Sequence, residues 1–204
     1  MRRRFSEVTG FVLAGGASLR MGRPKERLVL GGEMMLHRQV RLLASVCRSV
    51  AVLGPPANFP DLDVPVFADE LPGRGPLGGI YSGLIRTRTE YNLFLSCDLP
   101  FVEERFLHHL CRQAIASQAE VTVPALPEHT YQSLCAVYRR SARWAVRASL
   151  MVGENKARGI FSRVHLRVLS LRAISRAGFS PRILDNMNTV QDYEAAKRLL
   201  EGKA

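Results

Sequence analysis

The sequence has little from which to build a disulfide framework, a structural zinc site or a membrane span. Its 204 residues include only four cysteines, with no CxxC pair and no histidine at zinc-ligand spacing. We therefore expect the cysteines, at positions 47, 97, 111 and 135, to be small buried apolar residues in a reducing compartment. The longest apolar stretches, such as residues 91–97, are far shorter than the roughly 18 residues that a membrane helix requires.

The N-terminus lacks the uninterrupted apolar region of a secretory signal. Residues 1–4 are Met-Arg-Arg-Arg and an apolar stretch follows, but Glu7 and the glycine pair at positions 15 and 16 interrupt the pattern. We interpret this segment as a strand with the loop that follows it. We expect the protein in the cytoplasm, with no membrane partner.

Acidic residues are also in short supply, with 18 Asp and Glu against 29 Lys and Arg, a formal net charge of +11. Such a balance predicts an anionic partner, which nucleic acid, a membrane surface or a phosphorylated small molecule would all satisfy, and a generally basic surface is the simpler alternative. The sequence has no RRM, helix-turn-helix or zinc-finger pattern, and few aromatics lie between its dispersed basic residues. We therefore expect no nucleic-acid partner.

Short β-branched runs alternate with amphipathic segments along the chain, which is 47% hydrophobic. Strands are predicted at residues 8–13, 50–53, 64–67, 91–97, 120–124, 134–138 and 165–171. Helices are predicted at residues 34–48, 77–88, 103–117, 141–151 and 190–201. This alternation predicts an α/β fold in one domain over residues 1–204: a doubly wound, mostly parallel sheet with right-handed crossovers and helices on both faces.

A glycine-rich, cationic segment, LAGGASLRMGRPK, follows the first predicted strand at residues 13–25. Gly15 and Gly16 allow the backbone to turn with positive φ and to direct amide groups at a ligand. Arg20 and Lys25 supply the positive charge that a polyphosphate needs, because amides alone do not neutralise it. A flexible basic loop is the alternative. We predict a phosphate-binding loop.

Two familiar phosphate loops are absent from this segment. A P-loop requires a lysine and then Ser or Thr directly after its last glycine, whereas Gly22 is followed by Arg-Pro-Lys. The glycine spacing also differs from the dinucleotide fingerprint of Rossmann enzymes. Hydride transfer is therefore not the expected chemistry.

A single carboxylate, Asp98, stands at the carboxyl end of the apolar run in YNLFLSCDLP. Ligands of open α/β sheets bind outside the carboxyl ends of the strands, and an unpartnered carboxylate there is costly. Mg²⁺ that bridges substrate phosphates is the partner we predict, because this ion commonly uses one or two protein carboxylates. The alternative is that Asp98 caps the helix that begins near Glu103.

Two further loops carry candidate ligand contacts. Asp69 precedes a glycine-rich turn, with glycines at 73, 75, 78 and 79, that leads into a helix and is suited to wrap a base or ribose, or is a plain loop. Asn186 and Asn188 lie just before Thr189, the expected N-cap of the last helix. Their amides are suited to read a heterocycle, with turn formation as the alternative.

A basic cluster precedes the last predicted strand. Lys156, Arg158 and Arg163 are candidates for contact with a second phosphate. A solvated helix face is the alternative.

Together these segments resemble the molybdenum cofactor guanylyltransferases, within the wider nucleotidyltransferase group. The matching segments are LAGGASLRMGRPK, ADELPGRGPLGGI, SCDLP and NMNTVQDYEAA, in that order over nearly the whole chain. The LAGG glycine pair and the NxNT segment favour this family over cytidylyl-transferring relatives, which typically show LAAG. The resemblance implies a Rossmann-like nucleotidyltransferase fold whose N-terminal half binds the nucleotide and whose C-terminal half binds the acceptor.

The resemblance also implies the reaction and its partners. GTP and Mg²⁺ would bind, and the terminal phosphate of molybdopterin, the molybdenum cofactor, would attack the α-phosphate and release pyrophosphate. Cofactor-delivery proteins and recipient molybdoenzymes are implied as protein partners, and we expect a monomer. The alternatives are a cytidylyl transfer to molybdopterin or to a sugar or alcohol phosphate, and a nucleotide-binding regulator without turnover.

Carried over position by position, the resemblance assigns roles to particular residues. The catalytic set is Arg20, Lys25 and Asp98, with Asp98 as the magnesium ligand. The binding set is Leu13, Ala14, Gly15, Gly16, Lys25, Asp69, Gly78, Asp98, Asn186 and Asn188, in which the two asparagines face the pterin. Two positions depart from the family: Leu53 stands where a nucleoside-contacting asparagine is usual, and Val190 replaces the usual proline.

Overall fold

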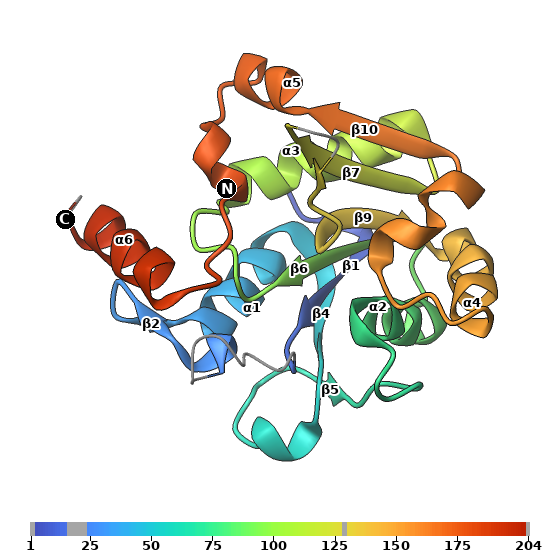
Figure 1. Ribbon diagram of the computed structural model, residues 1–204, viewed down its shortest axis with the longest axis horizontal. Coiled ribbons are helices and arrows are strands. Elements are labelled where there is room, and N and C mark those ends of the chain that lie inside the picture. The colour runs from blue at the N-terminus through green and yellow to red at the C-terminus, as the bar shows by residue number, and fades with distance from the viewer. Residues whose placement is uncertain (1–2, 16–23, 128–129, 203–204) are drawn as a thin grey trace.

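The computed structural model describes residues 3–15, 24–127 and 130–202 (Figure 1). Its centre is an eight-stranded sheet in the order β10-β7-β9-β6-β1-β4-β5, with β8 paired to β7. The strands are β1 (Phe5–Leu13), β4 (Cys47–Leu53), β5 (Val66–Phe67), β6 (Tyr91–Ser96), β7 (Val121–Leu126), β8 (Thr130–Tyr131), β9 (Cys135–Arg139) and β10 (Leu166–Ser170). Two short strands, β2 (Val29–Leu30) and β3 (Glu33–Met34), form a separate hairpin.

Helices cover both faces of the sheet, as predicted. They are α1 (Met35–Val46), α2 (Gly75–Arg86), α3 (Glu104–Ser117), α4 (Arg143–Met151), α5 (Leu171–Arg176) and α6 (Val190–Glu201). Short 3₁₀ segments are η1 (Lys25–Arg27), η2 (Pro56–Asn58), η3 (Arg140–Ala142), η4 (Ala157–Arg163) and η5 (Pro181–Leu184). The mostly parallel α/β fold is confirmed, and its strands and main helices begin and end within a few residues of the predicted positions.

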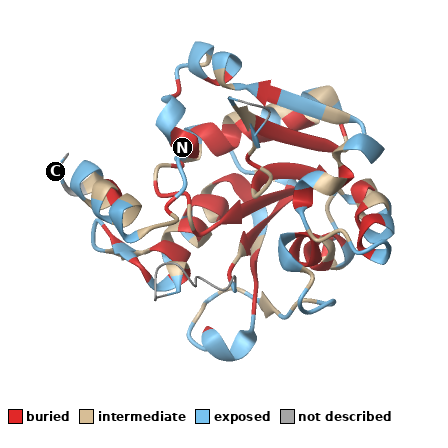
Figure 2. Cartoon of the chain, in the orientation of Figure 1, coloured by how far each residue is buried: buried red, intermediate tan, exposed pale blue. Residues whose placement is uncertain are grey.

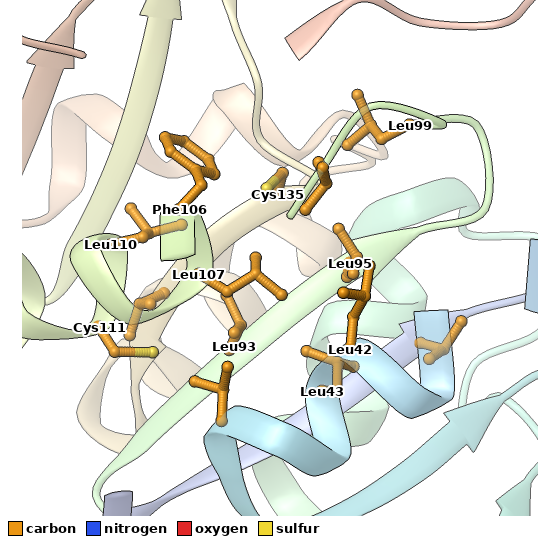
Figure 3. Packing of buried hydrophobic residues seen from close by; sticks show 14 of the residues in the cluster. Leu42, Leu43, Leu93, Leu95, Leu99, Phe106, Leu107, Leu110, Cys111 and Cys135 are labelled. Atoms are coloured by element: carbon orange, nitrogen blue, oxygen red, sulfur yellow. The ribbon is translucent and has the colours of Figure 1, made fainter. Parts of the chain in front are cut away.

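Central strands are buried on both faces, which explains their nearly continuous apolar runs. In β6, Leu93 and Leu95 pack with α1 and α3, whereas Phe94 between them packs with α2 on the opposite face. Figure 3 shows the first of these layers, with Leu43 and Leu107 directed at β6. Burial follows the sheet and the inner faces of its helices (Figure 2). The core therefore holds the sheet rigid, and the loops extend from the ends of its strands.

Two strands, β8 and β9, run against the others, and β8 pairs antiparallel with β7. β9 pairs antiparallel with both β6 and β7. The alternation of strands and helices predicted parallel pairing, but the described residues between β7 and β9 contain no helix. The chain therefore reverses directly through the short strand β8 instead of crossing over the sheet.

The last predicted strand extends one residue beyond β10 at each end. Ser170 ends β10 because its hydroxyl accepts the Ala173 N–H at 3.2 Å and caps α5. The helix α5 was not predicted, since it spans six residues and has too few turns to show a period.

The four cysteines are free and buried, as expected. Burial raises the pKa of each thiol, that of Cys135 to about 12. They therefore pack as small apolar groups rather than as reactive thiolates. Within the described ranges, none of the helices combines the length and the apolar character that crossing a bilayer demands.

Candidate active site

A cleft of about 750 Å³ opens at the carboxyl ends of β1, β4 and β6. Its walls come from these strand ends, from η1, and from the loop that leads into α2. Parallel strands whose crossover helices lie on opposite faces leave a crevice at this edge of the sheet, where ligands of α/β proteins bind. The predicted loops after the strands therefore meet in one place.

The first wall is formed where β1 and β4 end side by side. Leu13, Ala14 and Gly15 line the cleft, as do Leu53 and Gly54. The Ala14 N–H donates to the Leu53 carbonyl at 2.8 Å, and Gly15 has a φ of +137°, which strains any other residue. A Cβ on Gly54 would overlap the Ala14 carbonyl oxygen, so this close approach requires glycine.

Two predicted phosphate-binding residues, Gly16 and Arg20, lie outside the described residues, within 16–23. Their roles stay predictions. The segment re-enters the described structure at Pro24 and carries Lys25 into η1.

Lys25 joins three segments that are far apart in the sequence. Its Nζ lies 3.3 Å from Asp98 Oδ2 and donates to Asn188 Oδ1 at 2.6 Å. The side chains of Lys25 and Asp98 are 19% and 20% exposed, so the pair sits in the cleft rather than on open surface. Three residues predicted from three separate motifs are thus brought into contact.

Asp98 is held from several sides. The Ser96 hydroxyl donates to its Oδ1, and its backbone carbonyl accepts the Met187 N–H at 2.8 Å. The capping alternative is wrong: Glu103, not Asp98, is the N-cap residue of α3, and no side chain caps that helix end. The carboxylate therefore faces the cleft for another purpose.

The residues around Asp98 suit Mg²⁺ better than a cation that takes all its ligands from protein. In the described part of the chain, no group of three or more His, Cys, Asp or Glu side chains is placed to hold a metal ion. Mg²⁺ keeps several waters and takes the rest of its shell from one or two carboxylates and substrate phosphates. Asp98 offers such a carboxylate, and Glu26, which is 7% exposed, is a second one in the lining. The donor set therefore fits magnesium.

Gln39 was missed by the sequence analysis. This side chain of α1 is fully buried, and its Nε2 donates to the carbonyls of Ser96 at 3.3 Å and Leu99 at 3.0 Å. These carbonyls flank Asp98, so hydrogen bonds from α1 hold the loop that carries the carboxylate. The signal was present: Gln39 lies on the apolar face of its helix, three to four residues from Leu36 and Leu43.

Asp69 lines the cleft beside α2. Burial raises the pKa of its carboxyl group, and the nearby Arg86 guanidinium opposes that rise. The glycine that faces it is Gly79, where an added Cβ would lie 3.7 Å from Asp69 Oδ1. Gly78 was predicted as a ligand contact but does not line the cleft, because consecutive helical residues point about 100° apart.

The two asparagines of the NxNT segment are both hydrogen-bonded within the protein. Asn186 Oδ1 accepts from Gln132 Nε2 at 2.9 Å, while Asn188 holds Lys25. Met187 between them is buried, which anchors the segment. Residues 185–188 form no turn, so turn formation is not the role of these amides.

The expected N-cap of α6 is confirmed. Thr189 and Asp192 form a capping box, in which Thr189 Oγ1 accepts the Asp192 N–H at 3.1 Å. Asp192 Oδ2 also accepts the Asn188 N–H at 2.9 Å. The helix start therefore fixes the backbone of the residue that holds Lys25.

The basic cluster before β10 is not part of this cleft. Lys156, Arg158 and Arg163 are exposed and do not line it. The solvated-surface alternative therefore describes them.

Comparisons with known proteins point to a single family. A sequence model described as the MobA-like NTP transferase domain matches residues 10–168. A protein of Chloroflexus aggregans named "Probable molybdenum cofactor guanylyltransferase" is 33% identical over 199 residues, 95% of each chain. A protein of Mycobacterium tuberculosis with the same name is 37% identical over 156 residues, 73% of this chain and 76% of its own.

Solved structures share the fold at low sequence identity. Molybdopterin-guanine dinucleotide biosynthesis protein A from Archaeoglobus fulgidus superposes with a TM-score of 0.83 at 18% identity, covering 95% of this chain and 99% of its own. A 2-C-methyl-D-erythritol 4-phosphate cytidylyltransferase from Thermus thermophilus gives 0.73 at 16% identity, covering 96% and 99%.

The sequence match over most of the chain points to one family. The glycine-rich first loop and the carboxylate at the end of β6 are consistent with it. The chain belongs to the family of MobA-like NTP transferase domains and is a nucleotidyltransferase.

Proposed function

We propose that this enzyme transfers GMP from GTP to the terminal phosphate of molybdopterin, the molybdenum cofactor, with Mg²⁺ as its metal ion and pyrophosphate as the leaving group. The observation that carries the proposal is the contact of Lys25 with both Asp98 and Asn188. It joins the residues expected at the nucleotide to one expected at the acceptor. The names of the relatives supply the guanine and the acceptor.

The transfer needs no side-chain nucleophile. A phosphate monoester has a second pKa near about 6, so an oxygen of the acceptor phosphate is already ionised at neutral pH. This oxygen forms the new bond to the α-phosphorus, and the bond from that phosphorus to the β-phosphate bridging oxygen breaks. The electron pair of the broken bond leaves with pyrophosphate, and no general base is required.

The protein contributes position and charge. Lys25 is held in the cleft by Asp98 and Asn188, so its ammonium group is placed before a ligand arrives. Asp98, with Glu26 nearby, would hold Mg²⁺ on the phosphates. When bound, the ion supplies positive charge that stabilises the leaving pyrophosphate. Arg20 belongs to the same proposal.

The nucleoside is assigned to the end of the cleft that Asp69 lines. Leu53, Pro55 and Pro56 give that end an apolar wall, and Asp69 adds a carboxyl group. Leu53 carries no amide, so base contacts here would come from Asp69 and from backbone groups. Asn188, which contacts Lys25, and Asn186 of the same segment are assigned to the pterin, although neither of them lines this cleft.

The proposal extends to the cellular setting. The acceptor would be delivered by one protein and, after transfer, passed to a molybdoenzyme. Four buried thiols with raised pKa values suit the reducing cytoplasm.

Product analysis tests the proposed function. The purified protein is incubated with molybdopterin cofactor, Mg²⁺ and an equimolar mixture of ATP, CTP, GTP and UTP, and the nucleotide released from the product is identified. We expect GMP, with formation of pyrophosphate that stops on chelation of Mg²⁺. A CMP product would make the enzyme a cytidylyltransferase. Tight GTP binding without any product would make it a regulator.

Replacing Gln39 by leucine is expected to lower the transfer rate by about 10- to 100-fold and to raise the Mg²⁺ concentration needed for half of the maximal rate. The change removes the donor that holds the Ser96 and Leu99 carbonyls on either side of Asp98. The two carbonyls left without a donor should lower the free energy of unfolding by about 1–3 kcal/mol.

Val46→Ala is the matched control, because Val46 is fully buried on the same helix, and its apolar side chain donates no hydrogen bond to the Asp98 loop. It should lose comparable stability while its Mg²⁺ requirement stays that of the wild type. An equal Mg²⁺ requirement in both variants would show that Gln39 only stabilises the fold.

A further inference from the structure

A second cleft, of about 340 Å³, lies between α3, β10 and α5. It shares no lining residue with the nucleotide cleft. β10 is the last strand of the sheet order, and Figure 1 shows α5 and β10 at the end of the molecule opposite to β5. Nothing in the proposed transfer reaction uses this cleft, so its lining requires an explanation of its own.

The lining is strongly basic. Arg167, Arg172 and Arg176 contribute three guanidinium groups, and among the described residues that line the cleft none is acidic. All three arginines are exposed, and none takes part in the ion pairs found within the described ranges. Arg167 donates one long hydrogen bond, of 3.5 Å, to Gln113 Oε1. The cleft therefore concentrates positive charge without a protein counter-charge.

Two of these charges lie where they repel each other. Arg172 and Arg176 are four residues apart on the six-residue helix α5, and both line the same cleft. Like charges at this spacing destabilise a helix. An alternative explanation is that charged residues on an edge strand prevent it from pairing with other chains. That explanation accounts for Arg167 on β10 but not for the two arginines on α5. The pair on α5 is better explained by a ligand that neutralises it.

Neutral hydrogen-bonding groups complete the site. His109 packs against the Phe179 ring, with centroids 5.4 Å apart, and burial together with the Arg112 guanidinium lowers its pKa. Gln113 adds an amide one helical turn further along α3. The Ser170 hydroxyl is already used to cap α5.

We propose that this cleft is a second ligand site that binds a compact, multiply charged phosphate-class anion, such as pyrophosphate, independently of the nucleotide cleft. Guanidinium groups bind phosphate oxygens bidentately, and three of them here line one small cleft. Its volume is at the lower end of the range for small-molecule sites, which suits an anion of this size rather than a whole nucleotide. The proposal stands whether or not the transfer reaction is as proposed above.

Calorimetric titration with inorganic pyrophosphate, without Mg²⁺, tests the second site. We expect the wild-type protein to bind two equivalents, of which Lys25→Ala removes one. Arg172→Gln/Arg176→Gln should weaken the other by about 100-fold, since each charged hydrogen bond contributes about a factor of ten. Both arginines are exposed, so the double variant should show the thermal unfolding of the wild type.

Arg147→Gln/Arg158→Gln is the matched control, since both residues are exposed and line neither cleft. It should still bind two equivalents.

A single equivalent in the wild type that Lys25→Ala abolishes, or a second equivalent that the double variant on α5 retains, would overturn the proposal. A glutamate-rich peptide that binds through these arginines where pyrophosphate does not would also overturn it, and would assign the cleft to a protein partner. If the double variant fails to fold, Arg167→Gln on β10 should show about a tenfold loss instead, and an unchanged second equivalent there would overturn the proposal.

Discussion

Asp98→Asn is expected to lower the rate of magnesium-dependent nucleotidyl transfer by about 1,000-fold, with the fold intact. The amide keeps the shape of the carboxylate and an oxygen that accepts from the Ser96 hydroxyl, but it loses the negative charge that a magnesium ion requires. The amide oxygen can also accept from Lys25 Nζ, which keeps that contact in place and leaves the fold intact. Initial rates over a range of Mg²⁺ concentrations measure the effect.

Asp63→Asn controls for the chemical change, because Asp63 is exposed in the loop before β5 and lies outside the cleft. It should transfer at the wild-type rate. An Asp98→Asn enzyme within threefold of the wild type, folded and still dependent on Mg²⁺, would refute the assignment of Asp98 as the metal ligand.

Lys25→Ala is expected to weaken GTP binding and to reduce kcat/KM by about 100- to 1,000-fold. Among the described residues of the segment 13–25, Lys25 is the cation that lines the cleft, where it contacts Asp98. Its removal also leaves Asn188 without the ammonium group that it accepts from. We therefore expect the KM for the acceptor to rise as well as that for GTP.

Equilibrium binding of GTP and separate KM values for the two substrates check this prediction. Lys197→Ala, on α6 and outside the cleft, is the matched control and should behave as the wild type. Unchanged GTP affinity in Lys25→Ala would count against a phosphate-binding role for the first loop. A change in the GTP constants alone would separate Asn188 from acceptor binding.

The fold could be predicted where the pattern is local. Runs such as residues 91–97 are apolar on both faces because the strand they form, β6, is covered on both sides, and the helix over residues 190–201 was marked by its cap. The direction of β9 could not be predicted in this way. It depends on the connection after β7, whose described residues contain no crossover helix, and the residue pattern of a strand does not show which way the strand runs.

The site could be predicted residue by residue but not as an arrangement. Lys25, Asp98 and Asn188 each stood in a recognisable motif, yet the contacts between them depend on how the loops pack. Gly78 was chosen over Gly79 because spacing does not fix which face of a helix meets the cleft. Gln39 supports the site from inside the core, where a sequence pattern shows only one polar residue among apolar ones.

The most direct test of the central claim is a crystal structure of the protein with GTP and Mg²⁺. We predict density for the triphosphate along residues 13–25, beside Lys25, with the metal ion on Asp98 and the base near Asp69. Crystals in which this cleft is empty while the nucleotide lies elsewhere on the surface would contradict it.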